Sequence, residues 1–169
     1  MPHTTTETTT ETMTQPTILH NTFVIEHSYP VPPERLFAAF ADPGQKRKWF
    51  VESPNNDVKE YSLDFRVGGN EIVYYQMLPG TPLPGALFSV RSNYQLINPG
   101  KQIVAANTMI LNDHCISAAL ISFEFLPTAS GTDLVCTHQA AFFEGADGPE
   151  MRQMGWKSLL DKLAKVLEA

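Results

Sequence analysis

The stretch between Val58 and Phe143 is almost entirely strand-like, and it constrains the fold more than any other part of the chain. Six segments in it are rich in β-branched and aromatic residues, namely EYSLDFRV, NEIVYYQML, LFSVRSNYQLI, QIVAANTMIL, ISAALISFEFL and TDLVCTHQAAFF. The breaks between them are short and of turn-forming composition: Gly68-Gly69, Pro79-Gly80, Pro99-Gly100, Asn112-Asp113 and Ser130-Gly131. Successive strands joined by short turns predict an antiparallel meander.

A further strand and short helical pieces precede this stretch. Phe23, Ile25 and Tyr29 alternate with the residues between them, the period of a half-buried strand. The segment PVPPERLFAAFADP then predicts a short helix, because its proline pair suits a first turn and the Asp-Pro-Gly that follows ends it. The next segment, QKRKWFVES, predicts a second short helical or irregular piece.

Residues Pro149 to Glu168 predict one long amphipathic helix. Its apolar stripe comprises Met151, Gly155, Trp156, Leu159, Leu160, Leu163 and Leu167, whereas Arg152, Lys157, Asp161, Lys162 and Lys165 lie largely off it. We expect Gly155 to permit close backbone approach and Trp156 to lie near any internal cavity. One long helix against a strongly curved antiparallel sheet would bury the apolar faces of both, so the sequence predicts an α+β fold.

Length and charge limit the number of domains and the classes of partner. At 169 residues the chain suits a single domain, which we place at residues 18–169. Residues 1–17 predict a flexible tail, because they hold eight threonines in their first fourteen positions and almost nothing to bury. The net charge of -6 argues against a nucleic-acid partner, since the dense basic run Lys46-Arg47-Lys48 is short.

The expected location is the cytoplasm. No apolar stretch follows a basic N-terminal segment, and nowhere do 18 uncharged apolar residues run together, so neither a signal peptide nor a membrane span is predicted. Cys115 and Cys136 lie 21 positions apart without a CxxC pairing, which indicates neither a redox motif nor a zinc knuckle.

Four segments resemble, in order and spacing, a known superfamily. They are YPVPPERLFAAFADPGQKRKWF, LDFRVGGNEIVYYQ, GTDLVCTHQAAFF and GWKSLLDKLAKVL. They resemble the START-like, birch-allergen-like helix-grip superfamily (SRPBCC), and more narrowly the Aha-type domain of activators of the heat-shock protein 90 ATPase. The resemblance implies a curved seven-stranded sheet around the C-terminal helix. It also implies a cavity between them that in many relatives takes an apolar or amphipathic small molecule.

No motif of catalysis, metal binding or cofactor binding is present in the sequence. Gly68-Gly69 predicts a hairpin turn and not a phosphate loop, because a strand and not a helix follows it. His27, His114 and His138 lack the close pairing of metal ligands, and no GxSxG nucleophile elbow occurs. We therefore predict no catalytic residue, no metal and no cofactor.

The positive signal is an unusual supply of aromatic and methionine side chains on elements that surround one another in a helix-grip fold. Such side chains suit a deformable apolar pocket, so we expect a protein that binds a small apolar or amphipathic molecule. The candidate lining residues are Trp49, Tyr75, Met77, Phe88, Tyr94, Met109, Phe123, His138, Phe142, Trp156 and Leu160. Three polar candidates join them: His27, and the pair Asp64 and Arg66, which is expected on one strand face.

Two other functions stay open. The superfamily also includes polyketide cyclases and hydratases, and an enzyme of that kind would use polar cavity residues such as His27, Asp64, Tyr75 and His138. The resemblance to chaperone activators implies instead a protein-interaction module with a chaperone partner and a role in the stress response. Such a module would show an exposed patch and a filled interior. The residues leave open whether the chain forms a homodimer.

Overall fold

The computed structural model describes residues 16–169 of the chain. The predicted flexible tail, residues 1–17, falls outside the described part except for its last two residues. No helix between residues 16 and 169 is both long enough and apolar enough to cross a membrane.

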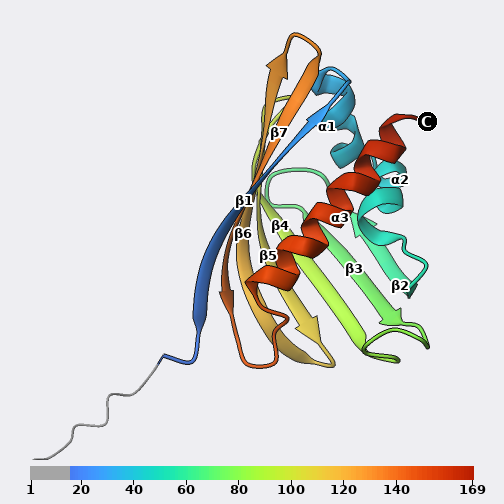
Figure 1. The fold of residues 1–169 in the computed structure, drawn as a ribbon, viewed down its shortest axis with the longest axis vertical. Coiled ribbons are helices and arrows are strands. Elements are labelled where there is room, and N and C mark those ends of the chain that lie inside the picture. The colour runs from blue at the N-terminus through green and yellow to red at the C-terminus, as the bar shows by residue number, and fades with distance from the viewer. Residues whose placement is uncertain (1–15) are drawn as a thin grey trace, which may run out of the picture.

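Seven antiparallel strands form one curved sheet, and a long helix lies across its concave face (Figure 1). The strand order is β1-β7-β6-β5-β4-β3-β2, so each strand from β2 onward pairs with the next and β1 joins the meander through β7. This confirms the predicted α+β helix-grip architecture. The elements are β1 (Leu19–Tyr29), α1 (Pro33–Ala41), α2 (Pro43–Lys46), the π-helix η1 (Arg47–Val51), β2 (Asn56–Leu63), β3 (Asn70–Met77), β4 (Leu87–Asn98), β5 (Gln102–Leu111), β6 (His114–Thr128), β7 (Gly131–Phe142) and α3 (Pro149–Leu167).

Two of the predicted turns show why their residues are needed. Asn112 and Asp113 have φ angles of 46° and 65°, the pair of positive values that a two-residue hairpin between β5 and β6 requires. In the connection between β2 and β3, a Cβ atom on Gly69 would lie 2.2 Å from the carbonyl oxygen of Asp64. Glycine is therefore required at this position by close backbone packing.

The helical region after β1 brings several large side chains together beneath α3. Asp42 caps α2, since its Oδ1 atom accepts a hydrogen bond from the Gln45 backbone N–H at 2.9 Å. The chain then passes directly into η1, one wide π-helical turn, a geometry found frequently at functional sites. Lys46 at the end of α2 and Trp49 within η1 are both buried as a result.

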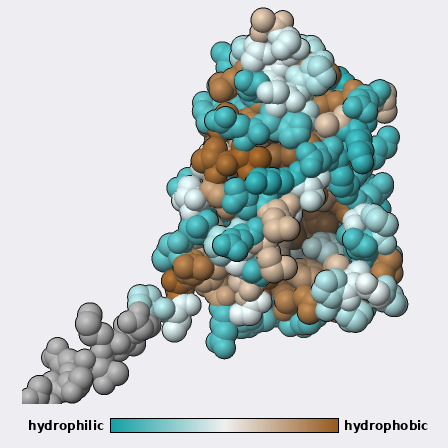
Figure 2. Space-filling view, in the orientation of Figure 1, coloured by the Kyte–Doolittle hydropathy of each residue, from teal (hydrophilic) through white to brown (hydrophobic). Residues whose placement is uncertain are grey.

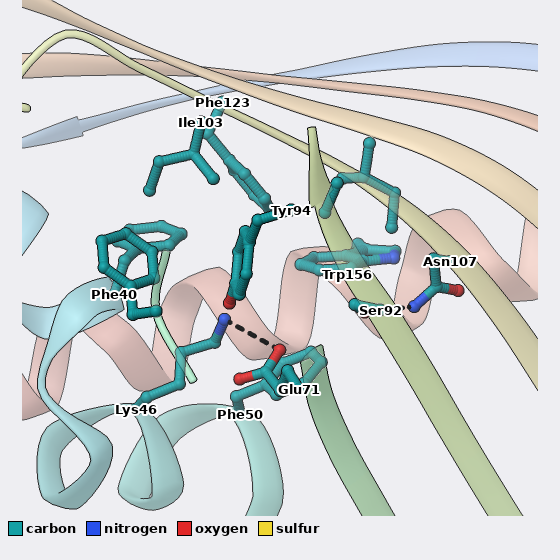
Figure 3. Close-up of a pocket in the computed structure, with 13 residues that line it drawn as sticks. Phe40, Lys46, Phe50, Glu71, Ser92, Tyr94, Ile103, Asn107, Phe123 and Trp156 are labelled. Atoms are coloured by element: carbon teal, nitrogen blue, oxygen red, sulfur yellow. Dashed lines mark hydrogen bonds and ion pairs between the residues drawn. The ribbon is translucent and has the colours of Figure 1, made fainter. Parts of the chain in front are cut away.

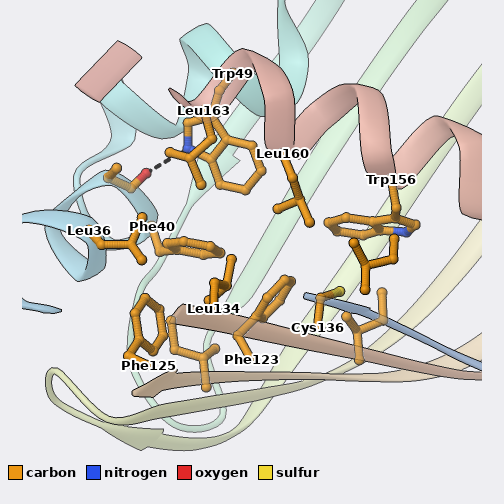
Figure 4. Packing of buried hydrophobic residues seen from close by; sticks show 14 of the residues in the cluster. Leu36, Phe40, Trp49, Phe123, Phe125, Leu134, Cys136, Trp156, Leu160 and Leu163 are labelled. Atoms are coloured by element: carbon orange, nitrogen blue, oxygen red, sulfur yellow. Dashed lines mark hydrogen bonds between the residues drawn. The ribbon is translucent and has the colours of Figure 1, made fainter. Parts of the chain in front are cut away.

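The main hydrophobic core lies between α3, the short helices and the concave face of the sheet (Figure 4). From α3 it receives Trp156, Leu160 and Leu163, as the apolar stripe predicts. Two hydrogen bonds join polar atoms inside it: Trp49 Nε1 donates to the Ala39 carbonyl at 2.8 Å, and the Tyr29 hydroxyl donates to the Leu160 carbonyl at 2.8 Å.

The first turns of α3 differ from the prediction. Met151, which the apolar stripe places on the buried side, is 65% exposed, and the nearby Met154 is 67% exposed, so neither belongs to the core. The prediction that Gly155 permits close backbone approach is wrong as well. Gly155 is exposed, and a Cβ added there would meet no atom within 4 Å. Arg152 is buried instead, because Asp147 accepts bonds from both Nε (2.9 Å) and Nη2 (2.7 Å) of its guanidinium.

Candidate functional site

A row of polar side chains crosses the largely apolar concave face of the sheet. Glu71 on β3 lies directly opposite Ser92 on β4, and Ser92 lies directly opposite Asn107 on β5. All three are buried, and Asn107 Nδ2 donates to Ser92 Oγ at 2.9 Å. Buried polar groups in an apolar setting are costly unless they have partners, so this row calls for a structural or functional reason.

Lys46 and Glu71 form a buried ion pair at one end of this polar row. Lys46 Nζ lies 3.3 Å from Glu71 Oε1, and the two side chains are only 6% and 3% exposed. The Tyr61 hydroxyl donates to the other carboxylate oxygen, Glu71 Oε2, at 3.1 Å. Both oxygens of Glu71 are therefore engaged by protein donors.

Aromatic rings enclose the ammonium group of Lys46. Its Nζ atom lies 5.5 Å from the ring centroid of Phe40, 5.2 Å from that of Trp49 and 4.5 Å from that of Phe50. Such cation–π contacts stabilise a cation that has lost its water. The π-helical turn η1 follows Lys46 and carries two of these rings, Trp49 and Phe50, three and four positions further along the chain.

Tyr94 contributes a hydroxyl group whose bonding is incomplete. The residue is 3% exposed, and within residues 16–169 its hydroxyl has no hydrogen-bond partner. Burial raises the pKa of Tyr94 above its ordinary value, and the Glu71 carboxylate raises the pKa further. The group therefore stays protonated at neutral pH and is available as a hydrogen-bond donor.

These side chains line a small cavity beside Trp156 (Figure 3). Its unfilled volume is about 20 Å³, which is enough for about one water molecule. Most of the space between α3 and the sheet is thus filled by side chains. The lining residues are Phe40, Lys46, Phe50, Phe65, Glu71, Ser92, Tyr94, Ile103, Ala105, Asn107, Ile121, Phe123 and Trp156.

A second apolar cluster extends the concave face of β3 and β4 beyond the cavity. Its buried members are Val51, Val73 and Val90, and half-buried side chains pack against them. At its outer end the rings of Tyr75 and Phe88 stack with centroids 5.3 Å apart, and neither residue is fully buried. Figure 2 shows that the molecular surface is hollowed beside α3 on this face.

His138 occupies the other side of Trp156. It is 0% exposed, its ring stacks on Phe23 at 4.5 Å, and its centroid lies 6.5 Å from that of Trp156. Burial lowers the pKa of His138 to about 4, and the nearby Arg152 also lowers it. Neither ring nitrogen has a hydrogen-bond partner among residues 16–169. The imidazole is therefore neutral at physiological pH.

The structure separates the predicted lining residues into groups. Tyr94, Phe123 and Trp156 line the cavity, and Tyr75, Phe88 and Met109 lie toward its outer end, with Met77 half-buried at the end of β3. Trp49 and Leu160 are completely buried in the main core. His138 and the buried Phe142 are neighbours, with ring centroids 6.3 Å apart.

The three predicted polar candidates lie away from the cavity. His27 stacks on Tyr29, and its Nε2 atom lies 3.3 Å from Asp161 on the solvent side of α3. Asp64 and Arg66 form an ion pair at 2.8 Å with side chains 53% and 77% exposed. The expectation that they share a strand face is wrong, because β2 ends at Leu63 and both lie in the turn that follows.

Sequence reasoning missed the polar residues of the site. Glu71 shares the face of β3 with Val73 and Tyr75, so strand alternation could have placed it beside the predicted candidate Tyr75. Lys46 appears in the sequence only as part of a basic run, and its partner is 25 positions away. Only the packing of α2 against β3 reveals that the two residues meet.

The chemistry available in this site is recognition more than reaction. Tyr94 and Lys46 are hydrogen-bond donors, whereas Glu71 is occupied in holding Lys46 and Tyr61. In the part of the chain that is described, no group of three His, Cys, Asp or Glu side chains is arranged to hold a metal ion. Cys136 is buried, which raises the pKa of its thiol to about 12 and leaves it a weak nucleophile.

The curved sheet, the helix across it and the cavity between them define a START-like helix-grip protein. A sequence profile of one family within this class, the activator of Hsp90 ATPase homolog 1-like proteins, matches residues 30–168. The chain therefore belongs to the AHSA1-like family, as the sequence motifs predict. No curated protein matches the chain.

Solved structures of bacterial proteins share the whole domain. An uncharacterized protein from Rhizobium leguminosarum is 34% identical, with a TM-score of 0.81 over 89% of this chain and 96% of that one. The Mll3558 protein from Rhizobium loti is 36% identical, with a TM-score of 0.79 over 88% of this chain and 98% of that one. An AHSA1-like protein from Aeromonas hydrophila, 18% identical with a TM-score of 0.61 over 88% of this chain and 92% of that one, shares the fold.

Proposed function

We propose that the protein binds a small, largely apolar or amphipathic molecule in the space between α3 and strands β3 to β6. The observation that carries this proposal is the buried polar row, Glu71, Ser92 and Asn107, which faces a cavity with mainly apolar walls. Sites for small molecules commonly combine apolar walls with a few polar groups that fix the orientation of the ligand.

The Lys46–Glu71 pair supports recognition more strongly than it supports stability. Removing two charges from water costs as much as, or more than, their attraction gains, so a buried ion pair contributes little to folding. A pair that borders a cavity can instead bind a polar group of a guest. Two half-buried side chains, Phe50 and Met109, pack against the second apolar cluster, and we expect them to move to admit a molecule larger than the cavity.

The test is a search for a guest, followed by a variant that fills the cavity. Native mass spectrometry of the purified protein, and a thermal-shift screen with lipids and aromatic compounds, should reveal a ligand that stabilises the fold. A ligand at 100 times its dissociation constant stabilises by about 2.7 kcal/mol.

Ala105 lines the cavity and its neighbour Ala106 does not. The substitution Ala105→Leu should therefore abolish the shift and Ala106→Leu should preserve it. A shift that survives both substitutions would contradict the proposed site.

A second candidate function is a protein-interaction module with a chaperone partner, acting in the stress response. The outer face of the sheet favours it, because four apolar side chains there are between 39% and 51% exposed: Val24, Leu96, Leu120 and Leu126. The family name mentions the Hsp90 ATPase, so the direct measurement is the rate of that ATPase with and without this protein. Stimulation that is lost on Leu120→Lys but kept on Ala105→Leu would favour this candidate. An unchanged ATPase rate would exclude it.

The cytoplasm remains the proposed location. Cys115 and Cys136 are both free, and Cys136 is completely buried in the core. Free thiols persist in reducing compartments, whereas secreted domains of small size more often pair them. Cell fractionation of the source organism is the corresponding test, and recovery of the protein outside the cytoplasm would refute this location.

A further inference from the structure

The charges around the cavity restrict which guests it can accept. The lining residues include one cation, Lys46, and one anion, Glu71, and these lie 3.3 Å apart. The two charges offset each other. A charged guest would therefore lose its hydration on entering and would find no unpaired opposite charge to replace it. The cavity therefore favours a molecule whose inner end is neutral.

Around the Lys46–Glu71 pair, unpaired hydrogen-bond donors outnumber unpaired acceptors. Both carboxylate oxygens of Glu71 already accept bonds, from Lys46 and from Tyr61. The Tyr94 hydroxyl, completely surrounded, finds no acceptor in the described residues 16–169. Figure 3 shows it directed toward the same space as the Lys46 ammonium, which has three N–H bonds and directs one at Glu71. The group that would complete this arrangement is an acceptor.

The size of the cavity limits what can enter it. Its volume of about 20 Å³ is close to that needed for a single water molecule. It can hold one oxygen atom of a guest, such as a carbonyl oxygen, but not the body of the molecule. That body must lie farther out, against the second apolar cluster, near Val73, Val90 and the half-buried Met109 that packs on them.

The strand register gives the length of the apolar stretch of the sheet beyond the cavity. Glu71, Val73 and Tyr75 alternate along one face of β3, and their partners on β4 are Ser92, Val90 and Phe88. With a strand rise of about 3.3 Å per residue, the Tyr75–Phe88 pair lies about 13 Å from the Glu71–Ser92 pair. The concave face between these two pairs is apolar and ends at the aromatic pair. Val73 and Val90 within it are buried under half-buried side chains, which a ligand must displace to reach them.

We propose that the guest is an apolar molecule about 13 Å long with one neutral carbonyl-type acceptor at the end that enters first. Tyr94 and Lys46 donate to that oxygen, and the apolar body lies over Val73 and Val90 with its outer end at Tyr75 and Phe88. This inference rests on the proposed ligand-binding function. It adds the polarity of the ligand, its orientation and its length.

Three probes of matched shape test the inference by equilibrium dialysis at pH 7.5. They are 4-acetylbiphenyl, which carries the ketone oxygen, 4-isopropylbiphenyl, which lacks it, and biphenyl-4-carboxylate, which is anionic. The ketone should bind about tenfold more tightly than the hydrocarbon, since a buried donor left without an acceptor is penalised. Tyr94→Phe should lower that ratio severalfold, because it removes the unpaired donor without removing the ring and leaves Lys46 as the single donor. The matched control is Tyr74→Phe on the opposite face of β3, which should leave the ratio unchanged.

Each result has a distinct meaning. Equal binding of ketone and hydrocarbon, or a ratio that Tyr94→Phe does not change, would overturn the inference and leave the proposed function standing. Tightest binding of the carboxylate would overturn the neutral-acceptor assignment in the same way. If none of the three probes binds, the inference fails, and the native mass spectrometry and lipid screen then decide separately whether the protein binds any guest.

Discussion

Lys46 Nζ lies 3.3 Å from Glu71 Oε1, and neither side chain is more than 6% exposed. The two residues come from a short helix and from a strand, 25 positions apart. Their contact therefore joins the helical region after β1 to the sheet. It also makes each charge dependent on the other, because neither has an alternative route to water.

Removing one partner should be far more harmful than removing both. Lys46→Met leaves the Glu71 carboxylate buried without its cation, and we expect a loss of about 3–5 kcal/mol in the free energy of unfolding. The double variant Lys46→Met with Glu71→Gln should recover most of this loss. The exposed Asp64–Arg66 pair is the control, since Asp64→Asn should change stability by less than about 1 kcal/mol. Urea denaturation measures these variants together with Glu71→Gln alone, and a loss in the double variant equal to the sum of the two single losses would refute the coupling.

His138 should make the protein less stable in acid. Burial and Arg152 lower its pKa from 6.5 to about 4, so between these values the unfolded chain binds a proton that the folded chain does not. Stability is therefore unaffected above pH 6.5 and falls as the pH decreases toward 4, by up to about 1.4 kcal/mol per pH unit. Urea denaturation from pH 7.5 to 4.5 should show a shallower decline for His138→Leu. The exposed His20 provides the control, because His20→Gln should keep the slope of the wild-type protein.

Trp156 should contribute to stability like a core residue. Its ring is 8% exposed and lies within 6 Å of two other aromatic rings, Phe50 at 5.9 Å and Phe123 at 5.7 Å. Trp156→Ala should lower the free energy of unfolding by about 3–5 kcal/mol. On the exposed side of the same helix, Met154→Ala should change it by less than about 0.5 kcal/mol. A loss for Trp156→Ala well below that range would indicate that the ring borders a wetter space than the structure shows.

Two glycines should respond to alanine in opposite directions. Gly155 lies in the middle of α3 with open space around it, so Gly155→Ala should stabilise the protein by about 0.5–1 kcal/mol. At Gly69 the new Cβ would lie 2.2 Å from the Asp64 carbonyl oxygen, so Gly69→Ala should destabilise it. Thermal unfolding followed by circular dichroism distinguishes the two, and a lower melting temperature for Gly155→Ala would contradict the helical environment described above.

The fold was predictable because its signals are local. Strand alternation, the turn at Asn112-Asp113 and the helical stripe of Trp156, Leu160 and Leu163 each follow from residues close together in the chain. One exception in α3, the buried Arg152, has a clear cause. Arg152 occupies a buried position because Asp147, five residues earlier, neutralises it, and periodicity alone treats an arginine as exposed.

The site was only partly predictable, because its polar members meet through tertiary packing. Aromatic residues such as Tyr94 and Trp156 could be placed on inward faces from their spacing. The Lys46–Glu71 contact depends on how α2 docks on β3, which no local pattern encodes. The volume of the cavity is likewise set by side-chain packing from eight different elements and not by any single segment.

The pairing of the first strand with the last has a consequence for synthesis of the protein. Leu19 pairs with Phe142, 123 positions later, and α3 follows only after that. While the chain is still being translated, β1 has no neighbour and the concave face of the sheet has no cover. Such long-range contacts slow folding, and they leave apolar surface open to other molecules in the meantime. The domain can close only after its C-terminal helix has left the ribosome, so truncation within α3 should produce an aggregating chain and not a smaller folded one.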